Sequence, residues 1–297
     1  MNKVTLKNIS TNGDPLEATF LPEGGMNLIS YRLGDIEVID QNTLPLYEER
    51  MAGLGALIGP HFHHRQKISR GYDETLFPHI ARIKAQGVEE PFSHGIARYV
   101  PWTYVKSTTQ IKAQIQGSDL YKGIPLSQFE GQDFKMSFEA RLLESGLHIE
   151  YKVESEFPSL VGLHYYYALE GKGVIHGAVN PTYRDQKEWK SLPTAWTQKQ
   201  GTALHFLLPQ EADFGFIPSK KTPNDHEYQM ILDTQAYTLH IEYNTSSEDE
   251  ISCQVFHPKE SSYVCIEPLS ARFPPQPKLS HSNLEVKLEI FPPQHQE

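Results

Sequence analysis

The sequence has few cysteines, no run of basic residues and no long apolar segment. Cys253 and Cys265 are the only two cysteines in 297 residues. This rules out a disulfide framework and leads us to expect reduced thiols and a cytoplasmic location. With 27 Lys and Arg against 37 Asp and Glu, the formal charge is −10, so neither nucleic acid nor an anionic membrane is expected as a partner. The longest apolar stretch, residues 54–58, is far too short to span a membrane, and the N-terminus lacks the apolar core of a signal peptide.

Strand periodicity is the strongest pattern that is present. Apolar and polar residues alternate over residues 134–142 and again over 147–153, with a Glu-Ser-Gly turn at 144–146, which predicts a hairpin. The same alternation occurs over 237–243 and 284–290. Shorter strands are predicted at 4–9, 17–21, 27–33, 111–116, 173–179 and 251–256. No long amphipathic helix is evident.

The 21 prolines and 20 glycines are spread evenly, without a linker or a repeat. We therefore predict a single all-β domain over residues 1–297. It should be a large antiparallel β-sandwich of two sheets, with roughly fifteen to twenty strands. Residues 41–80 and 209–228 do not follow strand periodicity and are predicted to be functional loops. Nothing in the sequence separates a monomer from a homodimer.

One short segment, residues 93–102, combines several groups suited to ligand binding. His94 is followed by Gly95, which allows a tight turn that presents the imidazole. Arg98 adds a permanent cation with five donors, and Trp102 adds a flat, largely apolar ring. An imidazole, a guanidinium and an indole so close together suit a polar ligand with an apolar face, such as a sugar.

Three further polar residues are candidates for a functional site because of the segments in which they lie. His164 lies within an apolar, aromatic strand at 161–169, and Glu267 ends an apolar strand directly before a proline. A carboxyl group in such a place has a raised pKa if it is desolvated. Arg65 follows a cluster formed by His61, His63 and His64. Each of these residues taken alone is more often structural than catalytic.

Taken together, these motifs resemble those of the galactose mutarotase-like, or aldose 1-epimerase, family. The most specific match is the His-Gly-Ile-Ala-Arg-x-x-x-Trp pattern that begins at His94. The glycine-rich approach to Arg65, the Gly-x-His element around His164 and the Glu-Pro pair at Glu267 follow in the order of the family. Further similarity lies at residues 24–34, so the resemblance spans nearly the whole chain. The family usually has Asn-Arg where this chain has His64 and Arg65, and often has Pro or Thr directly after His164, where this chain has tyrosine.

The resemblance implies a galactose mutarotase-like supersandwich that interconverts the α and β anomers of an aldose or aldose phosphate, without a cofactor or a metal. Such a reaction needs a base for the anomeric hydroxyl and an acid for the ring oxygen. The resemblance assigns these roles to Glu267 and His164, respectively. The residues expected to bind the sugar are His94, Arg65, Asp213, Arg98 and Trp102. Arg98 is slightly more strongly expected to hold the His94 loop together than to contact the ligand.

Several alternatives remain open at this point. The chain can be a sugar-binding protein of the same fold without turnover, or a hexose-6-phosphate 1-epimerase. The second is favoured by the positive charge of Arg65, Arg98 and the histidine cluster within an acidic protein. His61, His63 and His64 also suit a zinc site, although polar loop histidines are the commoner explanation. A Ser-His-Asp hydrolase finds no support, because no nucleophile elbow or comparable serine motif is present.

Overall fold

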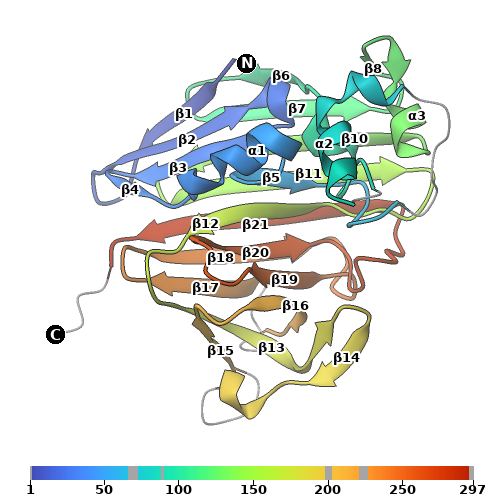
Figure 1. Ribbon diagram of the computed structural model, residues 1–297. Helices are drawn as coiled ribbons and strands as arrows, with labels where there is room; N and C mark the ends of the chain where they lie inside the picture. Colours follow the sequence, from blue (N-terminus) through green and yellow to red (C-terminus); the bar gives the residue numbers. More distant parts are fainter. Residues whose placement is uncertain (1, 66–72, 88–89, 198–202, 221–226, 294–297) are drawn as a thin grey trace.

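Two antiparallel β-sheets dominate the computed structural model, which describes residues 2–65, 73–87, 90–197, 203–220 and 227–293 (Figure 1). The first sheet runs β1–β2–β3–β5–β12–β20–β19–β16–β13–β14, with the short β4 beside β3. Its strands are β1 (Val4–Ile9), β2 (Pro15–Leu21), β3 (Asn27–Leu33), β4 (Ile36–Glu37), β5 (Gly55–Ile58), β12 (Gly162–Ala168), β20 (Tyr263–Leu269), β19 (Ser252–His257), β16 (Ala212–Pro218), β13 (Gly173–Asp185) and β14 (Glu188–Ser191).

The second sheet runs β6–β7–β10–β11–β21–β18–β17–β13–β15. Its other strands are β6 (Thr103–Lys106), β7 (Gln110–Gln116), β10 (Phe134–Leu143), β11 (Gly146–Ser155), β21 (His281–Phe291), β18 (Thr238–Thr245), β17 (Tyr228–Thr234) and β15 (Ala203–Leu208). The first half of β13 pairs within this sheet and its second half within the first sheet, so β13 joins the two. A separate small hairpin is formed by β8 (Leu120–Tyr121) and β9 (Ile124–Pro125).

Helices are short in the part of the chain that the structure describes. They are α1 (Leu44–Arg50), α2 (Pro78–Ala85), α3 (Leu126–Glu130) and the 3₁₀ helices η1 (Pro22–Gly24), η2 (Gln41–Thr43), η3 (Glu74–Leu76), η4 (Ile96–Tyr99) and η5 (Thr194–Trp196). None of these described helices has the length and apolar character needed to cross a membrane.

The core lies between the two sheets. Phe20 on β2 meets Phe138 on β10 edge to face, with ring centroids 5.9 Å apart. The Tyr31 hydroxyl of β3 donates a hydrogen bond to the Leu288 carbonyl of β21. Alternate residues of β10 are buried, as its hydrophobic period requires. The predicted all-β sandwich and its central hairpin are therefore confirmed, with Leu142 opposite Leu147 next to the turn.

The prediction of long irregular loops was wrong in part. Residues 55–58 form β5, and residues 212–218 form β16, which pairs on both sides with β13 and β19. Its proline and aspartate content conceals a strand whose partners lie far away in the sequence. Residues 66–72 and 221–226 lie outside the described part of the chain.

Strand β12 shows how the fold positions polar groups away from the core. Leu163, Tyr165 and Tyr167 belong to the core cluster between the sheets. Since successive side chains of a strand point to opposite faces, His164 and Tyr166 lie on the other face of the first sheet. That face is also buried, because the loop after β5 and the loop before η4 cover it: the Phe62 and His94 rings lie 4.9 Å apart, and the His94 ring meets the His164 ring.

Candidate active site

A row of polar side chains crosses the covered face of the first sheet. Gln254 on β19 is in register with Glu267 on β20 and, on its other side, with Gly215 on β16. Gly215 in turn pairs with Arg184 on β13. His164 on β12 completes the row, with its Nε2 3.4 Å from Oε1 of Glu267. Because residues directly opposite one another share a face, four polar groups from four strands line up side by side.

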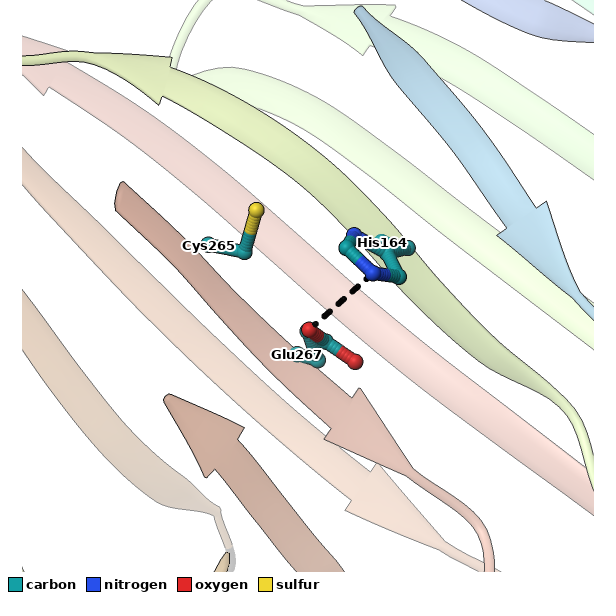
Figure 2. Close-up of side chains that lie close together, drawn as sticks. All are labelled: His164, Cys265 and Glu267. Atoms are coloured by element: carbon teal, nitrogen blue, oxygen red, sulfur yellow. Dashed lines mark ion pairs between the residues drawn. The ribbon is translucent and has the colours of Figure 1, made fainter. Parts of the chain in front are cut away.

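The centre of the row is the pair formed by His164 and Glu267, drawn in Figure 2. The exposed fraction is 7% for His164 and 1% for Glu267. Tyr166 stacks on the His164 ring with centroids 4.9 Å apart and fixes its orientation. Nδ1 of His164 and Oε2 of Glu267 are both buried without a hydrogen-bond partner. Buried polar atoms are nearly always paired, so these unmet hydrogen bonds suggest a place for a polar ligand.

Burial sets the protonation of this pair. It raises the pKa of Glu267 well above its usual range, and the Asp213 carboxylate adds to the effect, while Arg98 and Arg184 oppose it. Burial likewise lowers the pKa of His164 well below its usual range, and the positive charge of Arg98 lowers it further. Both shifts favour the neutral forms. Burial therefore favours a protonated Glu267 and a neutral His164 in the free protein.

Asp213 lies at the exposed edge of the row, held by two residues that the sequence analysis missed. Nε2 of Gln254 donates to Oδ1 of Asp213 at 2.7 Å, and Nη2 of Arg184 donates to Oε1 of Gln254 at 2.5 Å. Glycine at 215 makes room for this arrangement, since a Cβ there would lie 2.7 Å from Nη2 of Arg184. Gln254 interrupts an apolar strand just as His164 does, so the same signal identifies it. Nothing in the local sequence marks Arg184.

His94 reaches the pair from the loop before η4. Its ring lies edge-on to His164 with centroids 5.2 Å apart, and its Nδ1 is buried without a partner. Glycine is required at 95, where φ is 90° and a Cβ would lie 1.9 Å from the Gly59 carbonyl oxygen. Arg98 follows, 3% exposed, with Nε donating to the Leu57 carbonyl and Nη2 unpartnered. Arg98 thus ties its loop to β5, as expected, while its charge acts on the pair.

Two of the residues expected to bind the sugar have their contacts elsewhere. Arg65 is buried in an ion pair with Glu90 at 3.1 Å, and its Nη1 donates to a backbone carbonyl. Trp102 belongs to the core cluster, and its Nε1 donates to the Ala97 carbonyl at 2.9 Å. The structure therefore does not bring Arg65 and Trp102 into the cluster around His164. Both make polar contacts within the scaffold.

The histidine cluster also divides. Nδ1 of His61 lies 2.5 Å from Oε1 of Glu130, while the exposed His63 and His64 rings meet edge to face with centroids 4.8 Å apart. His63 lies 5.2 Å from the His94 ring and so flanks the candidate site. The alternative of a zinc site on these three histidines finds no support in the described residues, because their donor atoms do not converge.

Comparison with solved structures finds proteins of the same fold. No protein-family model and no curated protein matches the sequence. Among solved structures, a galactose mutarotase-like protein from Lactobacillus casei is similar, with a TM-score of 0.67 at 14% identity over 98% of this chain and 100% of the other. A GalM/aldose epimerase homologue from C. elegans gives 0.64 at 14% identity, covering 99% and 100%.

A galactose 1-epimerase from Lactobacillus acidophilus gives a TM-score of 0.54 at 10% identity, covering 98% of this chain and 99% of the other. Identities this low establish architecture and leave activity open. The similarity nonetheless extends over the full length of both chains in each case. This protein therefore has the galactose mutarotase-like fold, the β-sandwich found in the aldose 1-epimerase proteins.

Proposed function

We propose that the protein is an aldose 1-epimerase, which interconverts the α and β anomers of a sugar by opening and closing its ring. The observation that carries the proposal is the buried pair of His164 and Glu267, 3.4 Å apart, with one unmet hydrogen-bonding atom on each residue. The fold supports the proposal, since a galactose 1-epimerase is among the similar structures.

The reaction needs one group that accepts a proton and one that donates a proton. Ring opening removes the proton from the anomeric hydroxyl and protonates the ring oxygen; closing reverses both transfers after the carbonyl has rotated. Glu267 and His164 share one proton and so supply both functions. Each residue acts as an acid in one half of the cycle and as a base in the other. The raised pKa of Glu267 and the lowered pKa of His164 favour Glu267 as the donor in the opening half.

The remaining polar groups bind the sugar in this proposal. His94 and Asp213 are placed to hydrogen-bond hydroxyl groups, with Asp213 oriented by Gln254 and Arg184. Arg98 stabilises negative charge that develops on the sugar oxygens, as a buried cation does most effectively.

We propose a neutral aldose as the substrate, ahead of a phosphorylated one. The expectation of an anionic sugar counted five cationic side chains, but His61 and Arg65 each lie against a buried glutamate. Of the rest, burial lowers the pKa of His63, which favours its neutral form, and the negative charge of Asp213 lies nearby. The local positive potential is therefore smaller than the sequence suggests.

The test is to follow freshly dissolved pure anomers of several hexoses, free and 6-phosphorylated, by polarimetry or NMR at low and high salt. The proposal predicts catalysed equilibration of a neutral hexose, with kcat/KM at least equal to that of its 6-phosphate. His164→Asn should abolish most turnover while sugar binding stays measurable by calorimetry. Sugar binding without turnover in the wild-type protein would instead identify a non-catalytic sugar-binding protein.

A further inference from the structure

Three side chains with metal-binding donor atoms converge on the covered face of the first sheet. His164 comes from β12, and Cys265 and Glu267 come from the same face of β20, two residues apart (Figure 2). One donor atom from each residue lies within 4.8 Å of the other two. All three residues are buried, and Cys265 has no disulfide partner.

The separations suit a small divalent ion. Zinc holds nitrogen, sulfur and carboxylate ligands at about 2.0–2.3 Å in a tetrahedron, which places ligand atoms about 3.3–3.8 Å from one another. Nε2 of His164 and Oε1 of Glu267 already lie 3.4 Å apart. The other separations are at most 4.8 Å, so side-chain adjustments of about 1 Å complete the geometry.

The donor set selects the class of metal. An imidazole, a thiolate and a carboxylate suit Zn²⁺ and related ions, whereas Mg²⁺ and Ca²⁺ prefer oxygen ligands alone. We propose that His164, Cys265 and Glu267 form a three-ligand site for a thiophilic divalent cation of the zinc type, with the fourth position left to water or a sugar oxygen. A thiolate and a carboxylate together neutralise the ion, so no net charge is buried.

Two features of the surroundings modulate the site. Tyr166 stacks on His164 and holds the imidazole in place, as outer contacts of a metal ligand do. Arg98 acts electrostatically on all three groups, and its positive charge opposes a cation. We therefore expect binding weaker than at a structural zinc site. His164, 7% exposed, has the largest exposed fraction of the three ligands.

An ion held here occupies the pair that the proposed function uses for proton transfer. The metal binding does not depend on that function, but its consequence does: Zn²⁺ should inhibit anomer interconversion, and a chelator should restore it. Metal binding and sugar turnover therefore compete for the same two side chains, His164 and Glu267.

Cadmium provides a direct probe of binding, because a Cd²⁺–thiolate bond absorbs in the ultraviolet. Titration of the reduced protein with CdCl₂ should give a saturable band, confirmed by calorimetry. Cys265→Ser should weaken Cd²⁺ binding more than about 100-fold, since loss even of an outer-shell partner costs about 10–100-fold. Cys253→Ser is the matched control. Cys253 is equally buried on the neighbouring strand β19, and its substitution should leave the band unchanged.

His164→Asn keeps both thiols and guards against a folding defect in the cysteine variant, as checked by circular dichroism; it should also weaken Cd²⁺ binding. The proposal is overturned if the wild-type protein gives no saturable band, or if Cys253→Ser loses the band while Cys265→Ser keeps it. Inhibition by Zn²⁺ is measured separately, relative to each variant's own activity. A Cd²⁺ band without any epimerase activity would refute the proposed function alone, and activity without a band would refute the metal site alone.

Discussion

Within the part of the chain that the structure describes, two buried pairs of histidine and glutamate differ in what surrounds them. In one, His61 lies 2.5 Å from Oε1 of Glu130, while Oε2 of the same carboxylate accepts a hydrogen bond from the Ile96 backbone at 3.1 Å. In the other, His164 lies 3.4 Å from Oε1 of Glu267, and Oε2 has no partner. Glu130 is 3% exposed and Glu267 is 1% exposed, so burial alone does not distinguish the pairs.

The difference lies in how completely each carboxylate is used. Glu130 on α3 joins the loop that carries His61 to the start of η4, just after His94, and so holds two loops of the site together. Glu267 makes no comparable link, and its Oε2 has no hydrogen-bond partner. A buried carboxylate with both oxygens hydrogen-bonded stabilises a fold, whereas one with an unmet oxygen is retained at a cost. We therefore assign Glu130 to the scaffold and Glu267 to the chemistry.

The largest expected effect is that of Glu267→Gln. Glutamine keeps the shape of the side chain but cannot exchange a proton, so turnover should fall by about 10²–10⁴-fold. The free energy of unfolding should change little, because Oε2 has no native hydrogen bond to lose. Polarimetry and urea denaturation measure the two quantities. Turnover within a few-fold of wild type would remove Glu267 from the mechanism.

Glu130→Gln should show the opposite profile. One native contact of the carboxylate is lost, because an amide presents an N–H group where Glu130 has an acceptor. Leaving a buried polar group unsatisfied costs about 1–3 kcal/mol, which urea denaturation will detect. Turnover per folded molecule should fall far less than in Glu267→Gln. If activity falls as steeply while stability is unchanged, our separation of the two pairs is incorrect.

Arg184→Met tests the exposed edge of the site, where we expect a smaller effect than at Glu267. Without the guanidinium, Gln254 loses the partner of its Oε1 and no longer holds Asp213 in one orientation. A lost hydrogen bond to a charged group corresponds to about 1.5–3 kcal/mol at most. We expect KM to rise about tenfold, with kcat changing less, because binding groups shared by substrate and transition state act this way. Arg184→Lys should recover part of the loss; a fall in kcat alone would contradict the assignment.

The smallest effect concerns His79, a buried histidine paired with the Pro91 carbonyl at 2.7 Å instead of a carboxylate. Burial lowers the pKa of His79, although the carbonyl partly opposes this. The unfolded chain therefore takes up a proton near pH 6.5 while the folded chain does not. Its contribution to stability is present above about pH 6.5 and is lost as pH falls toward the folded pKa, by at most about 1.4 kcal/mol per pH unit.

His79→Gln keeps an N–H donor but cannot titrate. Urea unfolding between about pH 7.5 and about pH 5.5 should show a shallower loss of stability in the variant than in the wild-type protein. Identical slopes would mean that His79 is not held neutral by burial. The result shows how far burial alone, without a neighbouring carboxylate, lowers the pKa of a histidine in this fold.

Much of the fold follows from the sequence, because strand periodicity is a local property. The alternation in residues 134–153 predicted β10, β11 and their turn, and the polar interruptions at His164 and Glu267 identified two residues that the sheet then placed together. Strand β16 escaped prediction because its two neighbours, rather than its own pattern, make it a strand.

Tertiary structure alone decided which polar residues share a site. His164 and Glu267 meet because β12 and β20 pair across the sheet, and Arg184 joins Gln254 only through the register that runs over Gly215. Arg65 and Trp102 carry the same motif signal as His94, yet Glu90 and the Ala97 carbonyl engage them elsewhere. A sequence specifies the period and polarity of each strand, but the register between distant strands sets which groups a buried charge meets. The tertiary structure decides this, because a buried charge without a partner is costly to desolvate.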